Sequence, residues 1–253
     1  MKTFLNRHKP LIVPMILSGT VENVISEISR CKAEGADGIC LCSQLLQPQE
    51  RTEDNFLKII KACGELPLYA ACYQRGNVSQ IKQSDEELAD TLLLLLKCGA
   101  TLIDVRGDFF DENEEEFTMD ISAVQKQADF IKTLHKSGGE VIMSTHVFKF
   151  IPKDKIIQIA TEQEKRGADI IKIVVFAETE EQVDEYYRTI LYLKSHIKKP
   201  ILFLLNGKDA FRFRLAMPLI YNPSIMMCVE NSCVDAPQPT ISCCKQALKI
   251  YNR

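Results

Sequence analysis

Lys172 is the residue with the clearest potential for chemistry, because it is a cation within the apolar segment 170–176. Side chains alternate between the two faces of a strand, so Lys172 would share a face with Ile170 and Val174. In one interpretation, its stem packs in the core and its ammonium reaches the rim. However, an unpaired buried ammonium is costly, so burial favours the neutral amine, which is the form that attacks a ketone or aldehyde. The segment therefore predicts a lysine that forms a Schiff base.

His146 closes an earlier apolar segment, Val141-Ile-Met-Ser-Thr-His-Val-Phe148. If the two segments are neighbouring strands, His146 and Lys172 reach the same edge of the sheet. A histidine at a strand end is often a structural hydrogen-bonding residue, but beside an amine it can also move protons while an imine forms and hydrolyses. We expect the catalytic role.

Arg214 is a third candidate, in the polar segment 206–216. An arginine at this position could bind a substrate carboxylate through two parallel hydrogen bonds. The alternative is that Lys208, Arg212 and Arg214 all lie on a solvated helix. The spacing of these residues does not decide between the two interpretations.

Eight short apolar segments, rich in β-branched residues, would position these side chains. They are residues 11–17, 38–42, 68–72, 102–105, 141–145, 170–176, 201–205 and 225–229. Helical spacing follows in segments that include 21–33, 84–97, 121–136, 153–166, 179–196 and the closing segment 240–251. Strand and helix patterns therefore alternate along the chain.

Three of the joints between a helix and the next strand share a Gly-Ala pair, at Gly35, Gly99 and Gly167. Glycine is favoured where a helix ends in a left-handed cap, so the pair indicates a repeated unit. Strands that are apolar on both faces and joined by helices indicate a parallel sheet. Eight such units in 253 residues predict an α/β protein with one (β/α)8 TIM barrel domain over 1–253. The alternative is an open, doubly wound sheet.

Composition and charge exclude several classes of function. The formal net charge is -3, without a basic cluster, so no nucleic acid partner is expected. The N-terminus is polar and no apolar run is long enough to span a bilayer, so we expect no signal peptide, no membrane association and a cytoplasmic location. Residues 17–20, after the first strand, contain no glycine-rich phosphate motif, which argues against a nucleotide fold.

The cysteines and the acidic cluster are expected to be structural. Most of the ten cysteines should be reduced core thiols, because six fall in or beside apolar segments. The six are Cys40, Cys42, Cys63, Cys72, Cys98 and Cys228. The acidic cluster 111–116, together with Phe109 and Phe110, is expected to form a solvated loop without chemistry.

Two segments resemble the type I 3-dehydroquinate dehydratase family. Residues 141–148 are similar to its V-I-x-S-x-H-D-F segment, with Val147 in place of the aspartate. Residues 167–174 are similar to its G-A-D-x-x-K-I-A segment. Weaker matches include Asp104 in an I-D-V-E strand and Gln238 in an A-P-G-Q loop, so the resemblance covers nearly the whole chain.

The resemblance implies a function for each candidate. Lys172 would form the imine with the substrate ketone, His146 would shuttle the proton, and Arg214 would hold the carboxylate. The reaction would be the dehydration of 3-dehydroquinate to 3-dehydroshikimate, a lyase step of the shikimate pathway in aromatic amino acid biosynthesis. The substrate is then a small carboxylated ketone, no metal or organic cofactor is needed, and a homodimer is suggested.

The chain also departs from the family at polar positions. The family's charged pair on the second strand falls on Cys40 and Cys42, and its third-strand arginine falls on Tyr73. Its histidine-orienting glutamate falls on Asn77, which can accept a hydrogen bond but carries no charge. Its final serine falls on Asp235, and its glutamine falls on Pro239 or, with a shift of one residue, on Gln238.

Two other functions remain open on these grounds. One is a related Schiff-base lyase or aldolase with a different small keto acid, favoured by the retained Lys172 and His146. The other is a non-catalytic paralogue that binds a ligand, favoured by the lost charges on the second and third strands.

Overall fold

A nearly closed ring of eight parallel strands forms the interior of the protein in a computed structural model, which describes residues 2–6, 8–73, 83–221, 225–230 and 237–251. The strands are β1 (Leu11–Ile16), β2 (Ile39–Cys42), β3 (Leu68–Ala71), β4 (Leu102–Arg106), β5 (Glu140–His146), β6 (Ile170–Ala177), β7 (Ile201–Gly207) and β8 (Ile225–Cys228). Their order is β7-β6-β5-β4-β3-β2-β1-β8, so β1 pairs with both β2 and β8. This order is that of a barrel, and the open doubly wound alternative is wrong.

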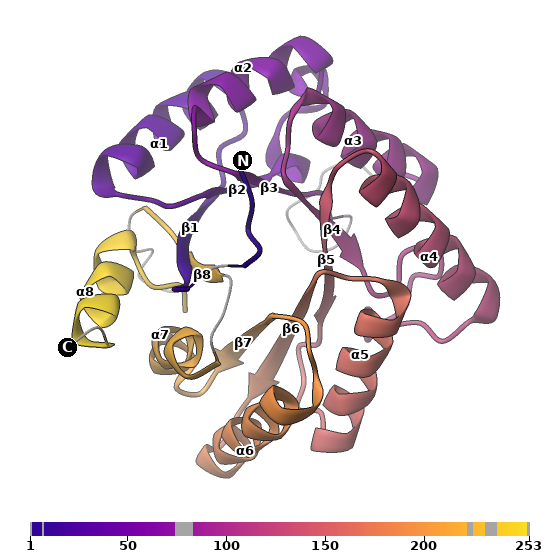
Figure 1. Cartoon of the computed structure of the whole chain (residues 1–253), viewed down its shortest axis with the longest axis vertical. Coiled ribbons are helices and arrows are strands. Elements are labelled where there is room, and N and C mark those ends of the chain that lie inside the picture. Colours follow the sequence, from indigo (N-terminus) through magenta and orange to yellow (C-terminus); the bar gives the residue numbers. More distant parts are fainter. Residues whose placement is uncertain (1, 7, 74–82, 222–224, 231–236, 252–253) are drawn as a thin grey trace.

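The helices lie outside the strands and surround them, as Figure 1 shows. They are α1 (Val21–Glu34), α2 (Glu53–Cys63), α3 (Asp85–Cys98), α4 (Ile121–Lys136), α5 (Lys153–Arg166), α6 (Glu180–His196), α7 (Ala210–Tyr221) and α8 (Ile241–Tyr251). Six of these helices match segments with helical spacing in the sequence, and α2 and α7 are not among the expected segments. The fold is the expected (β/α)8 barrel. In the described parts of the chain, no helix is both long and apolar enough to cross a membrane.

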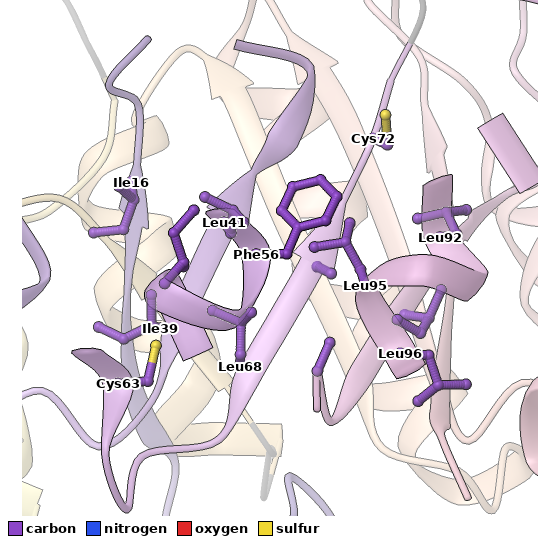
Figure 2. Packing of buried hydrophobic residues seen from close by; sticks show 14 of the residues in the cluster. Ile16, Ile39, Leu41, Phe56, Cys63, Leu68, Cys72, Leu92, Leu95 and Leu96 are labelled. Atoms are coloured by element: carbon purple, nitrogen blue, oxygen red, sulfur yellow. The ribbon is translucent and has the colours of Figure 1, made fainter. Parts of the chain in front are cut away.

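Each strand is apolar on both faces because each face has its own packing partner. The outward side chains of β2 and β3, such as Leu41 and Leu68, pack against Phe56 of α2 and Leu95 of α3 (Figure 2). The inward side chains fill the barrel interior in a separate cluster, which includes Ile170. This double burial explains why the strands read as continuous apolar runs.

The repeated helix-to-strand joint has the conformation that its glycine predicts. Gly35, Gly99 and Gly167 have φ values of 95°, 113° and 104°, all in the left-handed region. Each backbone N–H donates to carbonyls of the last helical turn, which satisfies groups that a helix end leaves free. The three joints predicted from the sequence are therefore confirmed.

Gly167→Ala is expected to lower the free energy of unfolding by about 1–2 kcal/mol, because alanine is strained at positive φ. The added Cβ would also lie 3.3 Å from Cγ2 of Ile131. Urea denaturation monitored by circular dichroism measures the change. Gly138→Ala, at a φ of 85° with open space around the added carbon, should carry the same backbone strain without the contact to Ile131, so the difference between the two variants measures that contact. A Gly167→Ala protein as stable as the wild type would contradict the requirement for the cap.

Candidate active site

Lys172 of β6 is buried in the barrel interior with its ammonium fully paired. The residue is 5% exposed, which excludes an ammonium that reaches solvent at the rim. Its Nζ lies 3.0 Å from Oη of Tyr69, 2.7 Å from Oη of Tyr73 and 3.3 Å from Oδ2 of Asp104. A lysine ammonium has three donors, and each of them has an acceptor here.

Asp104 of β4 supplies the counter-charge. Its Oδ1 accepts a hydrogen bond from Ser144 at 2.5 Å, and its Oδ2 accepts from the hydroxyls of Tyr69 and Tyr73. Desolvation acts to raise the pKa of Asp104, but the charge of Lys172 and these three donors outweigh it, so the pKa lies below its usual value. Burial raises the pKa of both tyrosines well above the usual value, so their hydroxyls stay protonated.

His146, at the end of β5, is oriented by a carboxylate. Its Nδ1 lies 2.7 Å from Oε2 of Glu116, and the same oxygen accepts the backbone N–H of His146 at 3.2 Å. A carboxylate at Nδ1 favours the tautomer that carries its proton there and leaves Nε2 as the basic nitrogen. The ring also meets Tyr73 edge to face, with 5.2 Å between ring centroids. Tyr73 therefore contacts both Lys172 and His146.

The prediction that residues 111–116 form a solvated loop is wrong at the last residue of the cluster. Glu116 is only 5% exposed, although other members of the cluster are exposed. Phe109 is also buried, with its ring 5.6 Å from that of Phe130. Charge patterning predicts a solvated run, but it does not detect one member that turns inward. The available signal was the location of the loop directly after a barrel strand, at the edge where active sites form.

The loop that carries Glu116 is held closely against the barrel. Thr145 donates a hydrogen bond to the carbonyl of Glu116 at 3.2 Å, and Arg166 of α5 donates to the carbonyl of Thr118 at 2.7 Å. A Cβ at Gly107 would lie 2.6 Å from the carbonyl oxygen of Glu116, so only glycine allows this approach. Glu116 itself has a φ of 46°, a strained value for a residue with a side chain.

Arg214 lies on α7 with its side chain buried. Its Nε donates to the carbonyl of Leu205 at 2.8 Å, and one terminal nitrogen donates to Oδ1 of Asn206 at 2.6 Å. The other, Nη1, is buried without a hydrogen-bond partner among the described residues. Burial lowers the pKa of Arg214 to about 10, so it is charged at neutral pH. The solvated alternative is wrong for Arg214, although it holds for Arg212, whose side chain is 86% exposed.

A cavity of about 240 Å³ connects these groups at the carboxyl ends of the strands. Its lining includes His146, Lys172, Arg214 and Gln238. Gln238 has a buried Oε1 without a hydrogen-bond partner in the parts of the chain described. The fifth predicted site residue, Asn77, lies outside the described residues. The structure thus brings four of the five predicted residues together.

Besides Glu116, Tyr69 and Tyr73 also belong to the site, and the strand pattern of the sequence indicates where both lie. Tyr69 lies on β3, and Tyr73 follows the strand two residues after Ala71. Because alternate residues of a strand share a face, Tyr69, Ala71 and Tyr73 all point to the barrel interior. The resemblance identifies Tyr73 only as the residue in place of the family's arginine, and it does not single out Tyr69. Their hydroxyls become informative once Lys172 is known to face the same interior.

Fold and site define a (β/α)8 barrel protein with a lysine buried at the carboxyl ends of its strands. A family model described as Type I 3-dehydroquinase matches residues 12–253. The chain belongs to this family.

Similar proteins have the same description. A 3-dehydroquinate dehydratase from Alkaliphilus oremlandii (strain OhILAs) is 34% identical over 88 residues, which is 34% of each chain. The 3-dehydroquinate dehydratase structure from Geobacillus kaustophilus HTA426 has a TM-score of 0.84 at 17% identity, covering 100% of this chain and 96% of that one. The type I enzyme from Clostridium difficile, solved with covalently modified comenic acid, has a TM-score of 0.84 at 16% identity, covering 99% and 96%. At these identities, the two structures show the shared fold.

Asp104→Asn is expected to lower the free energy of unfolding at pH 7 by about 3–5 kcal/mol, because it leaves Lys172 buried without a counter-charge. The folded pKa of Asp104 lies below its unfolded value of about 3.9, so its contribution is fully present above that pH. The contribution is lost as the pH falls through the folded pKa. Urea denaturation from pH 7 to pH 3 should show the difference from wild type constant above about pH 5 and shrinking below about pH 4.

The same substitution in a Lys172→Met background is the control for this prediction. Without the ammonium, the aspartate has no charge to balance, so Asp104→Asn should cost much less. A stability difference that does not narrow at low pH would contradict the ionised state of Asp104. An equal cost in both backgrounds would contradict its pairing with Lys172.

Proposed function

We propose that this protein is a hydro-lyase that dehydrates 3-dehydroquinate to 3-dehydroshikimate through a Schiff base on Lys172. One observation carries the proposal: Lys172, His146 and Arg214 line one cavity. These groups correspond to a nucleophile for a ketone, a proton carrier and a carboxylate anchor. Membership of the type I 3-dehydroquinase family supports the same reaction.

In the first stage, the Nζ of Lys172, after losing a proton, attacks the ketone carbon of the substrate. The carbinolamine then loses its oxygen as water and becomes an iminium ion. This loss needs a proton at the oxygen. Tyr73 lines the cavity with its Oη 2.7 Å from Nζ, so it is placed to relay that proton. Arg214 meanwhile holds the carboxylate, which fixes the ring relative to Lys172.

In the second stage, Nε2 of His146 removes a proton from the carbon between the iminium and the carboxylate-bearing carbon. The electrons of that C–H bond form an enamine, and the enamine expels the hydroxyl of the carboxylate-bearing carbon as water. Glu116 stabilises the imidazolium that His146 becomes in between. Hydrolysis then releases the enone and regenerates Lys172, for a net loss of one water molecule.

A related Schiff-base lyase with another small keto acid is the second candidate function. It is favoured by Cys40 and Cys42, which line the cavity on β2. A non-catalytic paralogue that binds a ligand is the third alternative, and the trapping experiment below distinguishes it.

We further propose that the protein acts in the cytoplasm as a homodimer in aromatic amino acid biosynthesis. This proposal rests on its family alone.

Borohydride should trap 3-dehydroquinate on this protein by reducing the imine to a stable secondary amine. Peptide mass spectrometry is expected to locate the adduct on Lys172, and Lys172→Ala should abolish it. Lys208→Ala, which removes an exposed lysine near the same edge, should retain full labelling and serves as the control. Labelling at a different lysine would refute the assignment, and no adduct with any carbonyl compound would favour the binding paralogue.

His146→Ala is expected to reduce kcat by about 10²–10⁴-fold with little change in substrate binding, because proton transfer is lost.

Glu116→Gln should reduce kcat by about 10–100-fold, since the amide keeps an acceptor but not the charge. Glu115→Gln is the matched control, because the adjacent Glu115 pairs with Lys149 and Lys155 instead. Steady-state kinetics and ligand titration separate the two effects. Equal rates for the Glu115 and Glu116 variants would remove Glu116 from the mechanism.

A further inference from the structure

One side of the cavity is lined by sulfur and hydrocarbon. We define the apolar arc as Met15 of β1, Cys40 and Cys42 of β2 and Met227 of β8, all of which line the cavity. These strands are neighbours, because β1 pairs with both β2 and β8. Cys40 and Cys42 are almost fully buried. Burial raises the pKa of the Cys40 thiol, whereas a hydrogen bond from Cys40 and the charge of Lys172 lower the pKa of the Cys42 thiol.

The polar side chains of the cavity come from other parts of the ring. Tyr73 follows β3, while His146 and Lys172 lie on β5 and β6. Asn206 and Arg214 come from β7 and α7. Gln238 is an exception, because it follows β8 and its Nε2 donates to Sδ of Met15 at 3.3 Å. A substrate that joins Lys172 to Arg214 therefore has most of its polar partners along these elements, and it has the apolar arc, with Gln238 beside it, along β8, β1 and β2.

Part of the polar capacity of these groups is used within the protein. The hydroxyl of Tyr73 is bound to Asp104 and Lys172, and Oδ1 of Asn206 is bound to Arg214. Within the described residues, the other polar side chains that line the cavity include Lys172, His146, Asn206, Arg214 and Gln238. They offer an amine for a carbonyl, a carrier for a proton, a cation for a carboxylate and two amides for hydrogen bonds.

A substrate hydroxyl against the apolar arc would lose its hydrogen bonds to water and gain only weak contacts with a thiol or thioether. A methylene in the same place gains from burial instead. An apolar wall of this kind disfavours an added hydroxyl by up to about a hundredfold. The compound 3-dehydroquinate carries three hydroxyl groups besides its ketone and carboxylate, and only one of the three leaves in the reaction.

We propose that the preferred substrate is a carboxylated β-hydroxy ketone whose carbons facing the apolar arc carry no hydroxyl, so that it is less hydroxylated than 3-dehydroquinate. This inference rests on the proposed function, because it keeps Lys172 as nucleophile and the same elimination. The C–H bond next to the ketone and the C–O bond of the leaving hydroxyl break, a C=C bond forms, and H and OH depart as water. No oxidant or reductant is needed.

The test compares two substrates on the full chain. The compound 1-hydroxy-3-oxocyclohexane-1-carboxylate keeps the ketone, the carboxylate and the leaving hydroxyl of 3-dehydroquinate but lacks its other two hydroxyls. Turnover of each is followed by the absorbance of the enone product. We expect kcat/KM for this compound to be at least about tenfold larger than for 3-dehydroquinate.

Two serine variants test the apolar arc as the cause of this ratio. Cys42→Ser places a hydroxyl in the cavity wall, and it should shift the ratio toward 3-dehydroquinate by about threefold or more. Cys72→Ser makes the same chemical change at a buried cysteine that is not part of the cavity lining. It should leave the ratio unchanged, because both substrates are measured on the same protein.

The outcomes separate the two proposals. Preference for the less hydroxylated compound, reduced in Cys42→Ser alone, supports the inference. Equal or better turnover of 3-dehydroquinate, or a ratio that Cys42→Ser does not move, overturns the inference and leaves the proposed function standing. Neither turnover nor a borohydride adduct on Lys172 with either compound overturns the proposed function, and the inference with it.

Discussion

The rest of the site depends on one ion pair, between Lys172 and Asp104 in the barrel interior. Neither charge could stay buried alone, and each has its remaining hydrogen-bonding capacity filled by hydroxyl groups. The hydroxyl groups belong to Tyr69 and Tyr73, on and just after β3, and to Ser144 on β5, while the two charges lie on β4 and β6. The pair therefore ties four strands to one geometry. It holds the amine of Lys172 at a fixed point of the barrel interior.

The second half of the site has a different architecture. His146 ends a strand, but the carboxylate that orients it comes from a loop, and that loop is held by contacts from β5 and α5. Rigid strands thus fix the amine of Lys172, whereas a braced loop fixes the ring of His146. Tyr73 touches both Lys172 and His146, so a change at either is transmitted to the other through a single ring.

The barrel could be predicted from the sequence because its signals are local: apolar segments, helical spacing and glycine at three helix ends. Lys172 and His146 were found because each interrupts or closes an apolar segment. Glu116 was missed because its role depends on the path of a loop, and loop paths follow tertiary contacts such as that of Arg166. The partners of Lys172 were missed for a similar reason, since strand register decides which inward side chains meet.

The origin of Glu116 bears on how members of this family should be compared. In the sequence, the family's histidine-orienting glutamate falls on Asn77. An alignment would therefore record the carboxylate partner of His146 as lost. In space, a carboxylate occupies the position beside Nδ1 of His146 all the same. An orienting group held by a loop can be exchanged for one from another loop without rebuilding the barrel. A comparison of the atoms around the imidazole ring therefore finds this carboxylate, whereas a comparison of aligned sequence positions misses it.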